Sequence, residues 1–229
     1  KLIQTISKKF KRVETIGYIH SPPMSMPANL IYRSTSPQKI ILNGKDQIHC
    51  FTRHLGWNKK KILFLPSFRF FERKSKINNL IYLPLSIKNI DNVIKNLVNL
   101  YHKNIIDITK FKIKSHPAAI SSKKNKIILE KFYVSVNGLK RKKNLFLKKN
   151  YLIFIGTSSA IIEALERGFN VIQICDNPLI DRYSEKLWPS LKSTKINDNI
   201  FIYTLRRKKN MIKFGIKNKN KNLLEKIVA

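Results

Sequence analysis

The stretch Tyr151-Leu-Ile-Phe-Ile-Gly-Thr-Ser-Ser-Ala-Ile-Ile-Glu-Ala-Leu-Glu-Arg-Gly168, followed by Val171-Ile-Gln-Ile-Cys175, decides the fold of this chain. Residues 152–155 are a short apolar run rich in β-branched side chains, which predicts a strand, and Gly156 permits a sharp turn after it. A helix is predicted next, because four residues share one helical face: Ile161, Ala164, Leu165 and Gly168. Residues 171–175 predict a second strand, so the stretch indicates a βαβ crossover and an α/β fold.

Three hydroxyl side chains occupy the predicted bend: Thr157, Ser158 and Ser159. They lie at the carboxyl end of a strand and the amino end of a helix, where free backbone N–H groups and the helix dipole favour an anion such as phosphate. Helix capping is the structural alternative, although one cap accounts for only one of the three hydroxyls. Glu163 lies nearly opposite the apolar face, so it is expected either to accept hydrogen bonds from a sugar hydroxyl or to be a solvated helix residue.

A second motif is Phe111-Lys-Ile-Lys-Ser-His116-Pro117, in which apolar and lysine residues alternate before a His-Pro pair. The alternation predicts a strand, and Pro117 biases His116 toward an extended conformation at the end of that strand. An imidazole in this position can donate a hydrogen bond to a phosphate or a carboxylate. A surface histidine without a ligand is the alternative.

The His-Pro pair, followed by the Gly-Thr-Ser-Ser…Glu-Ala-Leu-Glu-Arg-Gly block, resembles the nucleotide-sugar half of GT-B glycosyltransferases, in particular bacterial sialyltransferases, polysialyltransferases and capsule polysaccharide transferases. The stretches 17–23, 39–44 and 56–69 resemble the interdomain region of the capsule-type enzymes, so the resemblance spans most of residues 13–192. It implies two catalytic residues, His116 and Ser158. It also implies that the following residues bind substrate: His20, Pro117, Gly156, Thr157, Ser159 and Glu163. Neither a metal nor a cofactor is implied besides the nucleotide-sugar donor, for which the resemblance points to a CMP-linked sugar.

The same resemblance sets the expected domains. We expect residues 1–55 to be a remnant of an acceptor-side domain with its linker, residues 56–205 to form a Rossmann-like, nucleotide-sugar-binding domain with a parallel sheet, and residues 206–229 to be a basic tail with a terminal helix. Because the chain starts at Lys1 and few residues precede the linker, we expect a fragment whose catalytic base lies outside this sequence. Apolar runs at 80–85, 111–113, 152–155, 171–175 and 200–205 predict the strands, and helical spacing of apolar residues predicts a helix over 87–101.

Composition narrows the function classes. The 229 residues contain 46 Lys and Arg against 13 Asp and Glu, a net charge of +33, which is typical of nucleic-acid-binding proteins. The lysines are scattered through nearly every segment, however, and this argues against a localised recognition stripe. No apolar run approaches the roughly 20 residues of a membrane-spanning helix. Cys50 and Cys175 lack metal-site spacing, and Cys175 is expected in the core.

These features together predict a glycosyltransferase of bacterial surface polysaccharide synthesis that is cytoplasmic or peripheral at the inner membrane. Its expected partners are a nucleotide-sugar donor, a glycan or lipid-linked acceptor and an anionic membrane surface, without specific nucleic acid. The alternative is a basic nucleic-acid- or membrane-binding protein with a non-catalytic Rossmann-like core. A nucleotide-sugar epimerase is disfavoured, because its phosphate turn is usually richer in glycine than Gly156-Thr-Ser-Ser.

Overall fold

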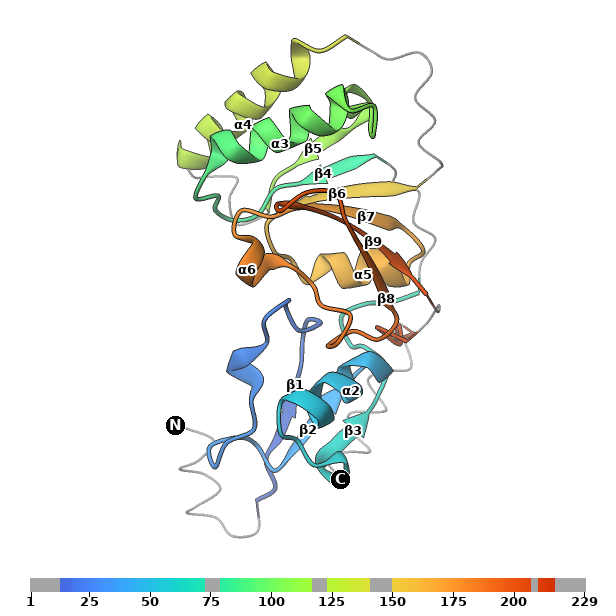
Figure 1. Cartoon of the computed structure of the whole chain (residues 1–229). Coiled ribbons are helices and arrows are strands. Elements are labelled where there is room, and N and C mark those ends of the chain that lie inside the picture. The colour runs from blue at the N-terminus through green and yellow to red at the C-terminus, as the bar shows by residue number, and fades with distance from the viewer. Residues whose placement is uncertain (1–12, 73–78, 117–122, 141–149, 207–209, 217–229) are drawn as a thin grey trace. The chain divides into compact units, whose positions relative to one another are not determined.

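A computed structural model describes residues 13–72, 79–116, 123–140, 150–206 and 210–216 (Figure 1). The chain forms two compact units. Unit 1 takes residues 1–75, 183–191 and 206–229, and unit 2 takes residues 76–182 and 192–205. Both units contain parallel strands and helices, so the expected α/β class is confirmed.

Unit 1 is built on a three-stranded parallel sheet in the order β1-β2-β3. The strands are β1 (Ile16–Tyr18), β2 (Lys39–Leu42) and β3 (Ile62–Phe64), and helix α2 (Lys45–His54) connects the second to the third. Short 3₁₀ helices lie at Ala28–Leu30 and Lys59–Lys61. The core gathers apolar residues of β2, of α2 and of the turn after α2: Ile40, Leu42, Cys50, Phe51, Leu55 and Trp57. Helix α2 was not predicted from the sequence.

Two later chain segments complete unit 1. Ser190 contacts the start of α2, where its backbone N–H donates to Asp46 at 2.8 Å. The segment after residue 209 also contacts the start of α2, since the side-chain amide of Gln47 donates to the carbonyl of Met211 at 2.9 Å. Further on, Gly215 forms an isolated parallel bridge with Phe71.

Unit 2 contains a six-stranded sheet in the order β5-β4-β6-β7-β9-β8. The strands are β4 (Leu80–Tyr82), β5 (Lys112–Lys114), β6 (Tyr151–Ile155), β7 (Asn170–Ile174), β8 (Leu191–Lys195) and β9 (Ile200–Leu205). The pairs β4–β5, β4–β6 and β6–β7 are parallel, with Ile153 opposite both Ile81 and Ile172. β9 pairs with β7 in the antiparallel direction, so the expected all-parallel sheet is wrong at this edge. The cause is the tight return over residues 196–200, which joins β8 to β9 without a crossover helix.

Helices cover both faces of this sheet (Figure 1). Helices α3 (Ile90–His102) and α4 (Lys123–Asn137) lie on one face, and α5 (Ala160–Glu166) lies on the other. α3 begins where the Asn89 side chain accepts from the N–H of Asn92, and its apolar stripe packs on the sheet, so the predicted helix is confirmed. A short 3₁₀ helix (Ile108–Lys110) precedes β5, and the single-turn α6 (Pro178–Asp181) follows β7.

The division into units differs from the expected boundaries at 55 and 205. Residues 56–75 and 183–191 belong to unit 1. Within 56–72 and 183–191, hydrogen bonds and apolar contacts go to the sheet and helix of that unit. The tail expected at 206–229 is described only at 206 and 210–216, where it forms no helix and instead runs beside residues 67–72. The rest of the tail lies outside the described residues.

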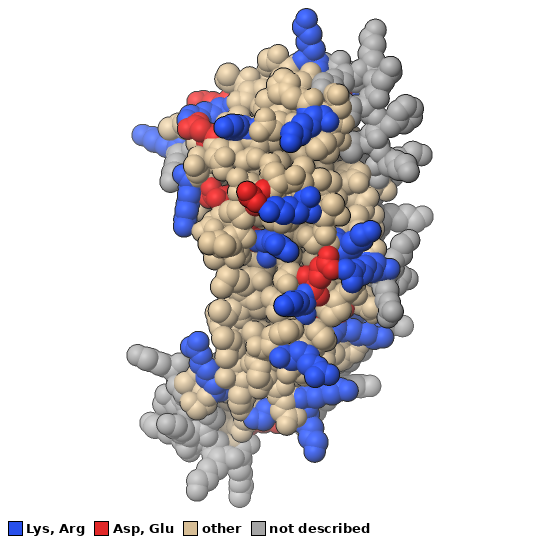
Figure 2. All heavy atoms as spheres, viewed as in Figure 1, with Lys and Arg blue, Asp and Glu red and all other residues tan. Residues whose placement is uncertain are grey.

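On the face shown in Figure 2, the described positive side chains are spread out rather than gathered in one stripe. On the face shown in Figure 2, Lys and Arg are scattered over both units with few acidic neighbours. Lys140 and Arg206, which open the two densest basic clusters in the sequence, are exposed, and the remainder of each cluster lies outside the described residues. No helix in the described ranges is long and apolar enough to cross a membrane.

Candidate functional site

The carboxyl ends of the parallel strands of unit 2 form the first candidate site. The chain leaves β4 toward β5 on one side and later adds β6 and β7 on the other side of β4. The loops after β4 and β6 lead to α3 and α5, which lie on opposite faces of the sheet (Figure 1). Neighbouring loops that diverge in this way leave a crevice, and open α/β sheets bind ligands at such a switch point.

The turn after β6 has the predicted shape. Gly156 adopts φ +66°, a left-handed conformation that favours glycine, and its N–H donates to the carbonyl of Ile174 at 2.8 Å. Ser158 holds the start of α5, since its hydroxyl accepts from Ala160 N–H at 3.2 Å and its carbonyl from Ile161 N–H at 3.0 Å. Ser159 occupies the N-cap position without a side-chain capping bond. Ser158 therefore binds the start of α5 through its side chain, whereas the N-cap residue Ser159 does not.

His116 lies at the same edge of the sheet, two residues beyond β5, and it is exposed. Strands β5 and β6 are separated only by β4. Because neighbouring strands lie about 4.8 Å apart, His116 and the Gly156 turn start roughly 10 Å from each other. Pro117 lies outside the described residues.

Two residues that sequence reasoning missed lie between these positions. Tyr82 ends β4 and stacks on Phe154 with ring centroids 4.6 Å apart, and Lys114 places its ammonium 5.5 Å from the Tyr82 ring. Burial, together with the negative charge of Glu163, raises the pKa of the Tyr82 phenol. The sequence carried a usable signal for both, since Tyr82 lies within the apolar run at 80–85 and Lys114 directly follows the run at 111–113.

Glu163 is bound to Arg167, one helical turn further along the chain. Both contacts of the guanidinium go to Oε1, with Nε at 2.9 Å and Nη2 at 2.8 Å, and the side chains of the pair are only 19% and 10% exposed. Glu163 is thus a partly buried, ion-paired residue of α5 rather than a fully solvated one. Both partners sit on or beside α5 and orient the carboxylate near the end of β4.

A buried polar network holds the loops of this edge in place. Gln173 is fully buried in β7, and its side-chain N–H groups donate to the carbonyls of Gly156 at 2.8 Å and Asp181 at 2.9 Å. The Asp181 carboxylate accepts from the N–H groups of Asp176 and Asn177, which lie in the loop that follows β7. The Asp176 carboxylate accepts from the backbone N–H groups of residues 88 and 89. The network thus fixes three loops relative to one another.

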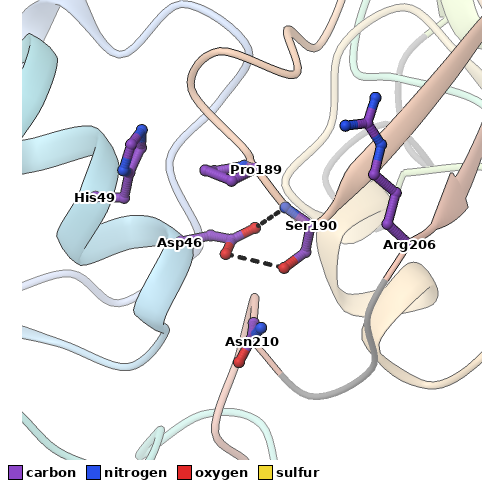
Figure 3. Close-up of a pocket in the computed structure, with 6 residues that line it drawn as sticks. All are labelled: Asp46, His49, Pro189, Ser190, Arg206 and Asn210. Atoms are coloured by element: carbon purple, nitrogen blue, oxygen red, sulfur yellow. Dashed lines mark hydrogen bonds between the residues drawn. The ribbon is translucent and has the colours of Figure 1, made fainter.

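A second polar site lies in unit 1, where a pocket of roughly 430 Å³ is lined by Asp46, His49, Pro189, Ser190, Arg206 and Asn210 (Figure 3). The sequence analysis did not predict it, because the lining comes from three segments far apart in the chain. Asp46 is only 5% exposed, and both of its oxygens accept from Ser190, one from the backbone N–H at 2.8 Å and one from the hydroxyl at 3.0 Å. Burial raises the pKa of Asp46, although the bonds from Ser190 and the nearby charge of His49 oppose that rise.

The remaining expected residues have ordinary surroundings. His20 belongs to unit 1, follows β1 and is exposed, with its ring 6.2 Å from that of Tyr18. Cys50 and Cys175 are buried free thiols, and burial raises their pKa values to about 11 and about 12, so Cys175 is a core residue as expected. Within the described ranges, His, Cys, Asp and Glu nowhere form a group of three that could hold a metal ion.

The structure thus places Gly156, Thr157, Ser158, Ser159 and Glu163 on one turn and its helix, with His116 further along the same edge of the sheet. His20 is in the other unit. In comparisons with known proteins, no family model, no curated protein and no solved structure matches this chain.

Proposed function

We propose that unit 2 binds the nucleotide of an activated sugar and that the chain is the donor-binding part of a GT-B-type glycosyltransferase of bacterial surface polysaccharide synthesis. The observation that carries this proposal is the position of the two motifs. His116 and the Gly156-Thr-Ser-Ser turn follow two parallel strands of one sheet, at the edge where the loops diverge. Sites of this type bind nucleotides by their phosphates in open α/β sheets.

In this proposal the turn and the histidine hold the phosphate of a CMP-linked, sialic-acid-like donor. The backbone N–H groups and hydroxyls of residues 157–159, together with the His116 imidazole, donate hydrogen bonds to the phosphate oxygens. When the bond between sugar and phosphate breaks, negative charge grows on the leaving nucleotide. Donors that are already in place stabilise that charge without reorganising. His116 and Ser158 are therefore assigned to the chemical step.

Glu163 is assigned to a hydroxyl of the sugar. Nε and Nη2 of Arg167 both contact Oε1, so Oε2 keeps its capacity to accept a hydrogen bond while the pair fixes the orientation of the carboxylate. Lys114, beside Tyr82, adds a positive charge on the path between the two motifs. The net charge of +33 would raise the local concentration of an anionic donor.

The acceptor is proposed to be a glycan or a lipid-linked glycan, with His20 of unit 1 on the acceptor side. An anionic inner-membrane surface would attract the exposed lysines, at about 1 kcal/mol for each Lys or Arg near the surface. The proposal therefore includes a cytoplasmic protein with peripheral membrane contact. Neither a metal nor a cofactor is assigned a role.

A titration of the whole chain with CMP, UDP, CDP and GDP at moderate salt tests the proposal. The expected result is selective binding of CMP that weakens about tenfold or more in His116→Ala and in the double variant Ser158→Ala/Ser159→Ala, since hydrogen bonds to a charged phosphate contribute about 1.5–3 kcal/mol. His102→Ala is the matched control, because His102 is an exposed histidine at the far end of α3.

A different outcome would favour the competing function. Binding of all four nucleotides that fades with added salt and ignores the three site substitutions would mean that the lysines alone attract them. The net charge of +33 is the observation that favours this second candidate, a basic protein that binds RNA or a membrane without transfer chemistry. Charge reversal of exposed lysines, such as Lys126 and Lys140, would then remove binding.

A further inference from the structure

Three separate chain segments meet at the first turn of α2. Gly44 precedes the helix, and a Cβ at this position would lie 1.8 Å from the carbonyl oxygen of Met211, so the returning chain packs directly on the glycine. The N–H of Asp46 donates to the carbonyl of Asn210 at 3.1 Å. Ser190 binds the Asp46 side chain from the third segment. The pocket in Figure 3 lies among these segments, all of which belong to unit 1.

The floor of this pocket is a buried carboxylate with acceptor capacity left over. A carboxylate offers about four lone-pair sites, and the two hydrogen bonds from Ser190 to Asp46 use two of them. Buried charges are stable only when hydrogen bonds replace the lost water. A ligand that donates to Asp46 would therefore improve the hydrogen bonding of the protein as well as its own.

The rest of the lining mixes donors, acceptors and one apolar surface. The Asn210 side chain offers an amide carbonyl and an amide NH₂, and His49 offers an imidazole from the next turn of α2. Arg206 contacts the carboxylate of Glu185, so its positive charge is already matched while its planar guanidinium keeps further N–H donors. Pro189 is exposed and adds the face of an apolar ring.

This combination selects among ligand classes. A phosphate or another anion is disfavoured, because Asp46 repels it and the charge of Arg206 is compensated. A metal ion is disfavoured by the guanidinium in the wall and by the lack of a third acidic, His or Cys ligand among the described residues. A purely apolar ligand would leave Asp46 without donors. Hydroxyl groups both donate and accept, so a ring that carries several of them meets every group in the wall.

We propose that this pocket is a binding site for a neutral polyhydroxylated group of the size of one sugar unit, with Asp46 accepting from its hydroxyls and Asn210 and Arg206 donating to them. The proposal goes beyond the function assigned to unit 2, which concerns a nucleotide on other residues. Failure of either proposal leaves the other standing, because the two sets of residues belong to different units.

The test is saturation-transfer NMR on the whole chain with three neutral probes, methyl glucoside, methyl galactoside and methyl mannoside. We expect at least one glycoside to bind, and we expect its affinity to fall about fivefold or more in Asn210→Ala, since one hydrogen bond contributes about 1 kcal/mol. Asn210→Ala keeps the backbone carbonyl that accepts from Asp46, so the start of α2 keeps that bond. Asp46→Asn is expected to weaken binding further, and His49→Ala serves as a second rim variant if Asp46→Asn fails to fold.

Two matched controls, Asn137→Ala and Asp198→Asn, change exposed residues of the same types in unit 2 and should leave binding unchanged. The proposal is overturned if none of the glycosides receives saturation, or if Asn210→Ala and His49→Ala bind as well as the unaltered chain. It is also overturned if inorganic phosphate or glycine binds with the same dependence on Asn210 while the glycosides do not. Those results would mark the pocket as an anion or zwitterion site.

Discussion

Replacing Gln173 by leucine removes the centre of the network that fixes the loops of unit 2. The side chain is fully buried, and it serves the carbonyls of Gly156 and Asp181 and the hydroxyl of Tyr203, at 2.8, 2.9 and 2.7 Å. Leucine has a similar volume, so the change creates little empty space. Its cost comes from polar groups that lose a partner inside the protein.

The expected size follows from those groups. Each buried group without a partner costs about 1–3 kcal/mol, so three of them give roughly 3 kcal/mol or more. Tyr203→Phe removes the hydroxyl and leaves only the side-chain carbonyl of Gln173 without that bond, which predicts about 1–2 kcal/mol. In the double variant the lost bond is counted once, so its cost should fall short of the sum by about 1 kcal/mol.

Hydrogen exchange under native conditions measures the loss of stability of unit 2 separately from that of unit 1. The slowest amides of β6 and β7 report the opening of unit 2, whereas Trp57 and Trp188, the two tryptophans of the chain, belong to unit 1 and report urea unfolding of that unit by fluorescence. Exchange in β6 and β7 should accelerate in Gln173→Leu while the fluorescence midpoint stays in place. Tyr133→Phe, at an exposed tyrosine of α4, is the control and should change stability by less than about 0.5 kcal/mol. A loss below about 1 kcal/mol for Gln173→Leu, or strict additivity with Tyr203→Phe, would refute the reasoning.

Three further predictions concern single sites. Gly44→Ala should destabilise unit 1 by about 3 kcal/mol or more, because the new methyl group collides with backbone; an unchanged midpoint in the fluorescence-detected urea titration would contradict it. Burial raises the pKa of Asp46 in the folded chain, so the contribution of Asp46 to stability should decrease as pH rises from 3.8 through that raised pKa. The pKa of Asp107 should instead lie below 3.8, because hydrogen bonds from residues 109 and 110 outweigh the effect of its burial. Carbon-13 NMR of the carboxyl groups measures both pKa values, and equal midpoints would refute both predictions. Iodoacetamide at pH 8 should alkylate Cys50 and Cys175 far more slowly in the native chain than in urea, since their thiol pKa values are about 11 and about 12, and mass spectrometry that finds fast native labelling would show one of them to be accessible.

The strands and helices that lie next to one another in sequence could be predicted from the sequence. The βαβ unit at 151–175 and the helix over 87–101 are visible because their apolar periodicities are local, and Gly156 signals a turn by itself. The antiparallel β9 escaped because periodicity tells that a strand exists but not which way its neighbour runs. α2 escaped because its polar first half, Lys45-Asp-Gln, carries no apolar signal at the helix start.

The candidate sites could likewise be predicted only where their residues lie next to a local sequence pattern. The hydroxyl turn and His116 could be placed at strand ends, because each lies directly after an apolar run. The Glu163–Arg167 pair is one helical turn apart, yet its partial burial depends on the packing of α5 on the sheet, which no local pattern reports. Asp46 and Ser190 are 144 residues apart, and their contact forms only after the chain has passed through unit 2 and re-entered unit 1. Nothing in the sequence around Asp46 distinguishes it from a surface residue.

The returns of the chain to unit 1 have a consequence for the order in which a ribosome-bound chain can fold. Unit 2 has received all of its parallel strands once residue 174 has been made, and its last strand, β9, which pairs with β7, is complete at residue 205. Unit 1 is different, because three of its contacts form only after later residues have been made. Asp46 binds residue 190, Gln47 binds residue 211, and Phe71 pairs with residue 215. The segment that is synthesised first is therefore completed last. A chain that ends at residue 205 should therefore resist protease within unit 2 while β1, β2 and β3 remain open to cleavage, because residues 211 and 215 of unit 1 are still missing.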